Sequence, residues 1–478
     1  MAGKAPTTVS TITWTSNTFA WAASPRLEQS TTEGDNDMSA VIYPTTNLAA
    51  TEQLTFDRGE GVYVYDRDGK QYLEGLAGLW CTGLGYGNRE LIDTISEQLG
   101  KLSYSHTFGG KTHQPVIDLG NKLAEMVPVK DAMVFFGNSG SDANDSHIKM
   151  LRYYFNAIGK PEKRKIITRE RAYHGVTVAA GSLTSLPANL AHFDAPLDAL
   201  GILRTDHPHY YRGAQGDETE AQFVARICNN LEQLILAEGP QTIAAFIAEP
   251  ITGASGVIVP PAGYYEKVQA ILDKYDILFW ADEVITGFGR TGELFGCDTM
   301  NIQQPAMMSF AKQLSSAYYP ISAAVIRGDM YEPMVAASEE VGVFGHGFTY
   351  SGHPVACAAA LKTLEIYQRD GLYQNAADQG KYLQSRLAEF MDFEQVGEVR
   401  GKGLLGAIEL VEDRTSRAPD IALAKKVTQA AQDNGLIVRN VAGNALAVCP
   451  PLIINRAQVD EMVEKLKTAI EQSIGSAS

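Results

Sequence analysis

Two charged side chains, Asp282 and Lys312, each interrupt an otherwise apolar segment, and they could serve one reaction. A charged group in apolar surroundings is costly unless it has a partner. Burial lowers the pKa of a lysine and frees its amine to act as a nucleophile, while a nearby carboxylate can stay ionised. Two other interpretations remain open. Asp282 could belong to a buried salt bridge, and Lys312 could be a surface lysine whose stem packs on apolar neighbours.

The segment MVFFGNSGSDAND (133–145) joins an apolar strand pattern to a turn rich in glycine and serine, followed by a helical pattern. Backbone N–H groups at such a helix start can bind an anion, and glycine allows a close approach. Ser139, Gly140 and Ser141 are the candidate residues for this cradle. An ordinary turn in which a serine or aspartate caps the helix would explain the same pattern.

Two further segments place polar or aromatic residues directly after strand-like runs. RAYHG (171–175) follows the run KIITR and contains Tyr173 and His174, and Glu249 follows another apolar run and precedes Pro250. Ligands of open α/β sheets bind at the carboxyl ends of the strands, where an aromatic ring can stack on a planar group. A packing tyrosine, a surface histidine and an acid in a turn are the alternatives.

Strand-like and helix-like patterns alternate through the middle of the chain, which predicts an α/β domain with a mostly parallel sheet. The expected strands are 132–136, 165–169, 244–249, 277–283 and 307–311, and the clearest expected helices are 223–239 and 264–275. Residues 62–74 alternate like a β-hairpin, with turn chemistry at Asp68–Gly69. The final part, from about residue 360, mixes long helices with short strands such as 404–410 and predicts a second lobe.

Composition excludes several classes of function. The 478-residue chain has a formal net charge of −16 and no basic cluster with interleaved aromatic residues, so we expect no nucleic-acid partner. No apolar run approaches the length that spans a membrane. The five cysteines are widely spaced, without a CxxC pair, which favours reduced thiols over disulfides and predicts no metal site.

Residues 1–38 differ from the rest of the chain. Twelve of them are serine or threonine, and Lys4 and Arg26 are the only charged residues before Glu28. A disordered leader is the main interpretation, and an organellar transit peptide, which is normally richer in arginine, is the alternative. We therefore expect a cytoplasmic protein, with a mitochondrial location as the alternative.

Several motifs occur in one order: GLWCTGLGYG, NSGSDAND, AYHG, ADEVITGFGRTG, FAKQLSSAYYP and HGFTYSGHPVA. With them, residues 40 to 470 resemble the class III aminotransferases, the omega-transaminases that use pyridoxal 5′-phosphate (PLP). The resemblance implies PLP fold type I. Its large domain (76–345) would hold a mostly parallel central sheet, and a smaller α+β domain would be built from N- and C-terminal segments (39–75 and 346–478).

The resemblance also implies roles in cofactor binding. Lys312 would form the Schiff base with PLP and later carry the substrate proton, and Asp282 would pair with the pyridine nitrogen. Tyr173 and Val284 would lie on opposite faces of the ring. The residues expected to contact the cofactor are Ser139, Gly140, Ser141, Tyr173, His174, Glu249, Asp282, Val284, Lys312 and, from the neighbouring subunit, Thr349.

Substrate residues follow from the same resemblance. Arg439 would be a mobile arginine that clamps a carboxylate and swings away for substrates that lack one. The other substrate-binding positions are Leu79, Trp80, Cys81, Phe108, Tyr173 and Ala254. Ala317 and Ser322 replace glycines that are frequent in the family, and both are small enough to be tolerated.

The implied activity is transfer of an amino group from an amine or omega-amino acid to a keto acid, most simply pyruvate, with ping-pong kinetics. Three alternatives remain: a 2-oxoglutarate-dependent 4-aminobutyrate or diamine aminotransferase, a PLP-dependent decarboxylase, and an aminomutase. The partners would be a small-molecule amine donor and a keto acid. The protein would form a homodimer with shared active sites, or a tetramer, without a nucleic acid or membrane partner.

Overall fold

The computed structural model describes residues 40–49 and 53–475. The chain divides into two units, Met1–Thr55 and Phe56–Ser478. In the first unit the described residues, 40–49 and 53–55, form turns and irregular backbone. The expected leader at residues 1–38 lies outside the described residues.

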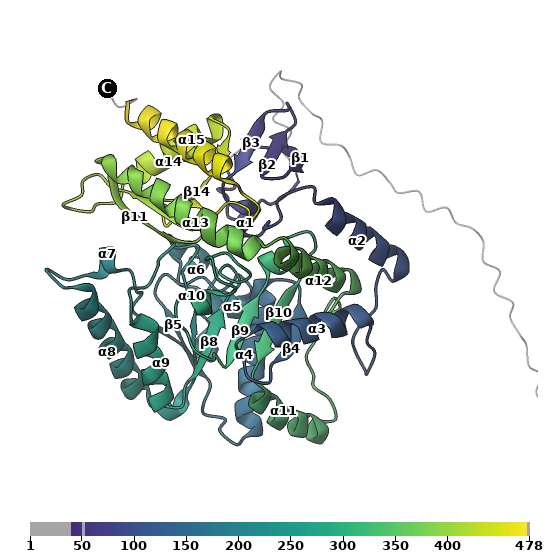
Figure 1. Ribbon diagram of the computed structural model, residues 1–478. Helices are drawn as coiled ribbons and strands as arrows, with labels where there is room; N and C mark the ends of the chain where they lie inside the picture. The colour runs from purple at the N-terminus through teal and green to yellow at the C-terminus, as the bar shows by residue number, and fades with distance from the viewer. Residues whose placement is uncertain (1–39, 50–52, 476–478) are drawn as a thin grey trace, which may run out of the picture. The chain divides into compact units, whose positions relative to one another are not determined.

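The second unit is built around a seven-stranded sheet, drawn at the centre of Figure 1. Only β10 runs antiparallel to its neighbours, and all other adjacent strands are parallel, which confirms the expected α/β fold. In spatial order the strands are β4 (Met133–Gly137), β10 (Ser322–Ile326), β9 (Met307–Phe310), β8 (Leu278–Asp282), β7 (Ile243–Ala248), β5 (Lys165–Arg169) and β6 (Ile202–Thr205).

Helices cover this sheet. In Figure 1, α8 and α9 lie side by side at the left of the sheet, and α3 lies at the right, next to β4. The longer helices around the sheet are α2 (Arg89–Lys101), α3 (Gln114–Met126), α4 (Gly140–Ala157), α8 (Glu220–Glu238), α9 (Tyr264–Lys274), α11 (Gly328–Val341) and α12 (Pro354–Arg369). The short ones are α1 (Ala77–Trp80), α5 (Val178–Leu183), α6 (Pro187–Leu190), α7 (Tyr210–Gly213) and α10 (Gly296–Thr299).

The C-terminal part adds an antiparallel sheet and three helices. The sheet contains, in spatial order, β11 (Val396–Lys402), β12 (Leu405–Leu410), β15 (Ala445–Val448) and β14 (Arg439–Val441). The helices are α13 (Leu372–Ala388), α14 (Ile421–Asp433) and α15 (Arg456–Gly475). The three helices lie together at the top of Figure 1.

A third sheet joins sequence-distant segments. β1 (Phe56–Glu60), β2 (Tyr63–Asp66) and β3 (Gln71–Glu74) form an antiparallel meander, which includes the expected hairpin. β13 (Leu436–Ile437) then pairs in parallel with β3, so that a C-terminal strand completes an N-terminal sheet. The exact domain boundaries given above stay a prediction.

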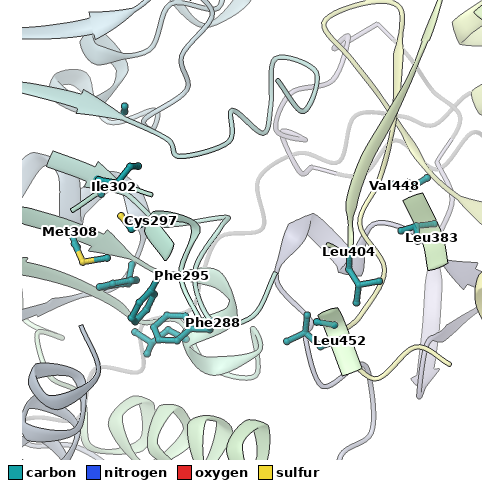
Figure 2. Packing of buried hydrophobic residues seen from close by; sticks show 14 of the residues in the cluster. Phe288, Phe295, Cys297, Ile302, Met308, Leu383, Leu404, Val448 and Leu452 are labelled. Carbon is teal, nitrogen blue, oxygen red and sulfur yellow. The ribbon is translucent and has the colours of Figure 1, made fainter. Parts of the chain in front are cut away.

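One hydrophobic cluster unites these parts. It contains side chains from the segment after β8, such as Phe288 and Phe295, together with C-terminal residues such as Leu404 and Leu452 (Figure 2). Burial of apolar surface contributes about 25 cal/mol per Å². The C-terminal part is therefore held against the central sheet by shared core packing.

Candidate active site

A cavity of about 330 Å³ lies at the carboxyl ends of the parallel strands. Five strand ends meet there: β4, β5, β7, β8 and β9, the position at which open α/β sheets bind ligands. The lining residues are Leu79, Cys81, Asn138, Ser139, Gly140, Ser141, Asn144, Tyr173, His174, Gly175, Glu249, Asp282, Val284, Ile285, Ala311, Lys312, Ser315, Ala317, Tyr319, Pro320 and Ile321.

Asp282 is the last residue of β8, and its carboxylate is buried with three hydrogen-bond donors. His174 Nδ1 donates to Oδ2 at 2.7 Å, Asn144 Nδ2 donates to the same oxygen at 3.1 Å, and the Val284 N–H donates to Oδ1 at 3.1 Å. Burial alone would raise the pKa of Asp282. The hydrogen bonds from His174, Asn144 and Val284 outweigh it and hold the pKa below its ordinary value. Asp282 is therefore ionised at neutral pH.

Lys312 comes two residues after β9, is partly buried and lines the same cavity. Burial lowers the pKa of its amine, and the negative charge of Asp282 opposes that shift. The backbone of Lys312 has a φ of 45°, a left-handed conformation that is unusual for a residue with a side chain. The expected strand 307–311 ends at Phe310 because the chain turns here.

Turn residues before α4 form the third feature. Ser139 caps the helix: its Oγ accepts the Asp142 N–H at 3.2 Å. Gly140 and Ser141 open the first turn of α4 and line the cavity. A Cβ built on Gly140 would lie only 2.9 Å from a methyl group of Val284, so glycine is required for this close packing. The helix cap and the anion cradle therefore occupy the same turn.

Glu249 fixes the backbone around Tyr173. Its two carboxylate oxygens accept the N–H groups of Tyr173 at 3.0 Å and Gly253 at 2.9 Å. Burial raises the pKa of Glu249, and the nearby Asp282 adds to this shift while His174 opposes it. Tyr173 and Val284 both line the cavity.

Five of the expected residues lie outside the cavity lining. Trp80 is buried, and the Arg439 guanidinium lies 5.4 Å from the centre of its ring. Among the described residues no carboxylate forms an ion pair with Arg439. Phe108 and Thr349 are exposed, and Ala254 is partly buried. Their expected roles stay predictions.

Sequence reasoning missed Asn144, although it quoted the segment that contains it. Asn144 lies one helical turn after Gly140, so both share the face of α4 that lines the cavity. Its amide bridges the Asp282 carboxylate and the His174 carbonyl, the latter at 2.6 Å. The four-residue spacing from Gly140 was the signal that could have found it.

Comparisons with known proteins agree with this geometry. The family description "Aminotransferase class-III" matches residues 46–470. The chain belongs to the class III aminotransferases. A gamma-aminobutyrate transaminase 1 from Oryza sativa subsp. japonica, named as mitochondrial, is 47% identical over 86% of this chain and 80% of its own length. A gamma aminobutyrate transaminase 3 from Solanum lycopersicum, named as chloroplastic, is 44% identical over 92% and 84%.

Solved structures are similarly close. The omega transaminase from Pseudomonas jessenii in complex with PMP has 48% identity and a TM-score of 0.89, and the match covers 93% of this chain and 98% of that one. A structure described as a transaminase with L-Ala has 50% identity and a TM-score of 0.87, over 89% of this chain and all of the other. This aminotransferase therefore uses PLP and exchanges an amino group between a small-molecule amine and a keto acid.

The cavity of this aminotransferase fits PLP chemically. A partly buried lysine with a lowered pKa can react with a carbonyl, and an ionised aspartate can pair with a pyridinium nitrogen. The start of α4 offers N–H donors for a phosphate. These groups converge on one cavity, although they come from segments up to 172 residues apart, from Gly140 to Lys312.

Outside the cavity, His209, Glu398 and Glu409 form the one described cluster close enough to hold a metal ion. Arg400 pairs with both of these carboxylates, and Arg212 pairs with Glu409. The cluster is thus an ion-pair network. No helix among the described residues is long and apolar enough to span a membrane.

Proposed function

We propose that this aminotransferase moves an amino group from an omega-amino acid or primary amine to pyruvate. The observation that carries the proposal is the convergence of Lys312, Asp282 and the N–H groups at the start of α4 on one cavity. Bound PLP supplies an electrophilic carbon and an electron-withdrawing ring. Lys312 Nζ holds the cofactor and carries the substrate proton.

The other roles follow from the contacts. Asp282 stays ionised and would accept a hydrogen bond from the protonated pyridine nitrogen, with His174 and Asn144 fixing its carboxylate. Gly140 and Ser141 would bind the phosphate, with Ser139 as the helix cap, while Tyr173 and Val284 would enclose the ring. Glu249 acts on Tyr173 through its backbone N–H.

Arg439 supports a donor whose amine is remote from any carboxylate. Its guanidinium lies over the Trp80 ring and has no ion-pair partner among the described residues, so it can clamp a keto acid carboxylate bidentately. Leu79, Cys81, Phe108 and Ala254 complete the proposed substrate pocket. One candidate donor is 4-aminobutyrate, the compound that the plant relatives' names call gamma-aminobutyrate. The others are beta-alanine, putrescine and bulkier amines.

Pyruvate is the proposed acceptor, and 2-oxoglutarate is the alternative. A solved relative is described with L-Ala, the amino acid that pyruvate yields. Decarboxylases and aminomutases of the same fold would use the same lysine and aspartate, so the acceptor assay separates them as well. Formation of alanine from pyruvate supports transamination with this acceptor.

The test follows the absorbance of the yellow, PLP-loaded protein. Adding an amine donor should bleach the absorbance, and pyruvate should restore it. Lys312→Ala should abolish the cycle, and Lys467→Ala, at an exposed position on α15, should leave it intact. Restoration by 2-oxoglutarate alone would show that 2-oxoglutarate, not pyruvate, is the acceptor. A protein that binds no PLP would overturn the proposal.

We propose in addition a homodimer with shared active sites, with a tetramer as the alternative. Ile117, Met133, Tyr331 and Val335 are exposed apolar residues over α3, β4 and α11, here named the α11 face. Met133 and Tyr331 line two neighbouring surface hollows there, which makes the α11 face continuous. An apolar surface of this kind is typical of a permanent interface.

The segments that carry Phe108 and Thr349 flank the α11 face. Thr107 Oγ1 donates to the Ser351 carbonyl at 3.2 Å, and Thr107 and Ser351 line the same hollow as Met133. A partner copy on the α11 face would thus receive Phe108 and Thr349 near its own cavity. This arrangement explains why both residues lie away from the cavity of their own chain.

The compartment is proposed to be the cytoplasm, with mitochondria as the alternative. The scarcity of arginine in residues 1–38 supports the first, and the names of the rice relatives support the second. A fluorescent protein fused behind residues 1–38 decides between them. Diffuse fluorescence supports the cytoplasm, and mitochondrial fluorescence overturns it.

A further inference from the structure

Residues 76–81, which follow β3 and include the short α1 with its non-helical backbone at Gly78 and Leu79, are here named the Trp80 loop. Leu79 and Cys81 line the cavity, and Trp80 packs beneath the Arg439 guanidinium. Small displacements of this loop would therefore move two walls of the cavity and the ring under Arg439 together.

The backbone of the Trp80 loop is strained. Ala77, Gly78 and Trp80 have φ angles of 49°, 66° and 58°. For alanine and tryptophan, this left-handed region costs roughly 1–2 kcal/mol per residue. Such a conformation persists only where surrounding contacts impose it.

Glu74 supplies contacts to this loop. It ends β3 with 3% of its surface exposed, and its Oε1 accepts the Leu76 N–H at 3.0 Å. The Gly78 N–H also lowers the pKa of the carboxylate. The Tyr86 hydroxyl lies 3.5 Å from Oε2. Among the described residues no lysine, arginine or histidine forms an ion pair with Glu74.

An unpaired buried carboxylate is costly. Burial raises the pKa of Glu74 to about 7, although the N–H groups of Leu76 and Gly78 and the Tyr86 hydroxyl lower it. The other titratable groups that interact with it are Cys81 and Cys449, and neither carries a positive charge. Glu74, whose burial is unfavourable, lies where β3 ends and the Trp80 loop begins.

We propose that Glu74 is a positioning residue for substrate binding, whose carboxylate holds the Trp80 loop in its left-handed conformation. This inference rests on the proposed function in assigning substrate contacts to Leu79, Trp80 and Cys81. The ionised carboxylate accepts both loop N–H groups. Protonation turns one oxygen into a donor and weakens the hold on the loop.

Gly75, which lies between Glu74 and the Trp80 loop, is also anchored by hydrogen bonds, and this fits the proposed role of Glu74. The Gly75 carbonyl accepts the Cys449 N–H at 2.6 Å, and the Gly75 N–H donates to the Ile437 carbonyl at 3.0 Å. Ile437 pairs with Glu74 in the sheet and lies two residues before Arg439. Glu74 thus stands at the junction between the Trp80 loop and the strand that leads to Arg439.

The first test measures alkylation of Cys81 by iodoacetamide in the purified holoenzyme. Cys81 is partly exposed, and the other four cysteines are buried, so mass spectrometry can follow it by itself. The variant Glu74→Gln presents an amide NH₂ to one of the two N–H groups and should loosen the loop. We expect the limiting alkylation rate at high pH to rise about tenfold, as the loss of one hydrogen bond to a charged group implies.

The limiting rate separates two effects. Removing the charge of Glu74 also lowers the pKa of Cys81, because Glu74 raises it. That electrostatic effect shifts only the midpoint of the rate profile, whereas a looser loop raises its plateau. The control Glu60→Gln, at an exposed position on β1, should change neither.

The second test is a kinetic one. Glu74→Gln should raise the KM for the amine donor about tenfold with kcat within twofold. In the wild type this KM should rise as the pH falls through 7, and in Glu74→Gln it should be high and independent of pH. Glu74→Asp, which keeps the charge, should restore the pH dependence in part.

The outcomes are distinct. An unchanged alkylation plateau with an unchanged KM in Glu74→Gln overturns the proposal. If Glu74→Gln does not fold, Glu74→Asp decides by the same plateau and KM. A raised plateau in a protein that transaminates no tested donor supports loop positioning and counts against the proposed function alone.

Discussion

Asp282 stays ionised because the hydrogen bonds from its three donors lower the pKa of the carboxylate by more than burial raises it. Two of the three donors are side chains, His174 and Asn144, and both are buried with it. A hydrogen bond to a charged group contributes about 1.5–3 kcal/mol. The loss of either hydrogen bond is thus large enough in free energy to alter the charge state of Asp282.

Asn144→Ala should therefore raise the pKa of Asp282 and lower kcat/KM about tenfold, since 1.4 kcal/mol corresponds to a factor of ten. Because the acid must be ionised, the acidic limb of the rate profile should move to higher pH. Steady-state rates with a donor and pyruvate between pH 5 and 9 check both effects. Asn156→Ala, at an exposed position on α4, should behave as the wild type; an equal loss in both variants would contradict the assignment.

At the scale of elements, α4 performs two tasks at its first turn. Ser139 and Asp142 form a reciprocal cap, and Gly140 and Ser141, in the same turn, line the cavity. The helix dipole adds a positive potential at that end. The position of α4 against Val284 then decides where a phosphate can bind.

Gly140→Ala should weaken PLP binding, because the new Cβ would lie 2.9–3.0 Å from two methyl groups of Val284 and displace the turn. We expect the dissociation constant for PLP to rise at least about tenfold, from 1.4 kcal/mol or more of overpacking. Titration of the cofactor-free protein with PLP measures it. Gly100→Ala, with open space around its Cβ in α2, should leave PLP binding unchanged and stabilise the fold.

The same elements show what a sequence can predict. Five of the seven central strands lie within a residue or so of the expected ranges, because their apolar runs are long and end in polar residues, whereas β6 and β10 were not expected. β13 and β14 were missed, since two or three residues carry no periodicity, and the pairing of β13 with β3 joins distant segments. Likewise Lys312 and Asp282 were found from charge in apolar surroundings, whereas the partners of Asn144 come close only in the fold, and the burial of Glu74 is visible only there.

At the scale of the whole molecule, ion pairs link the central part to the C-terminal sheet. Glu409 on β12 pairs with Arg400 on β11 and, at 2.5 Å, with Arg212 of α7. Burial would raise the pKa of Glu409, but Arg400, His209 and Arg212 lower it to about 2. Its folded pKa lies below the ordinary 4.5, so its stabilisation is present above pH 4.5 and is lost as the pH falls towards 2.

Glu409→Gln should destabilise the protein by about 3–5 kcal/mol at pH 7, because it leaves Arg212 without a counter-charge and Arg400 with Glu398 as its one remaining carboxylate partner among the described residues. Urea unfolding followed by circular dichroism measures the change. The difference from the wild type should shrink as the pH approaches 3. Glu412→Gln, an exposed position just after β12, should cost less than about 0.5 kcal/mol; a similar loss there would refute the role of the network.

The α11 face carries the last prediction, because a shared active site makes activity depend on assembly. The wild type should sediment with twice the chain mass of 51.8 kDa. Val335→Glu should raise the dimer dissociation constant roughly a hundredfold or more, since an unpaired charge is buried twice in a two-fold interface. Activity should fall with the dimer fraction, because Phe108 and Thr349 would no longer reach the partner's cavity. Leu236→Glu, on the exposed side of α8, should keep the dimer and its activity. A fully active Val335→Glu monomer would show that each chain completes its own site.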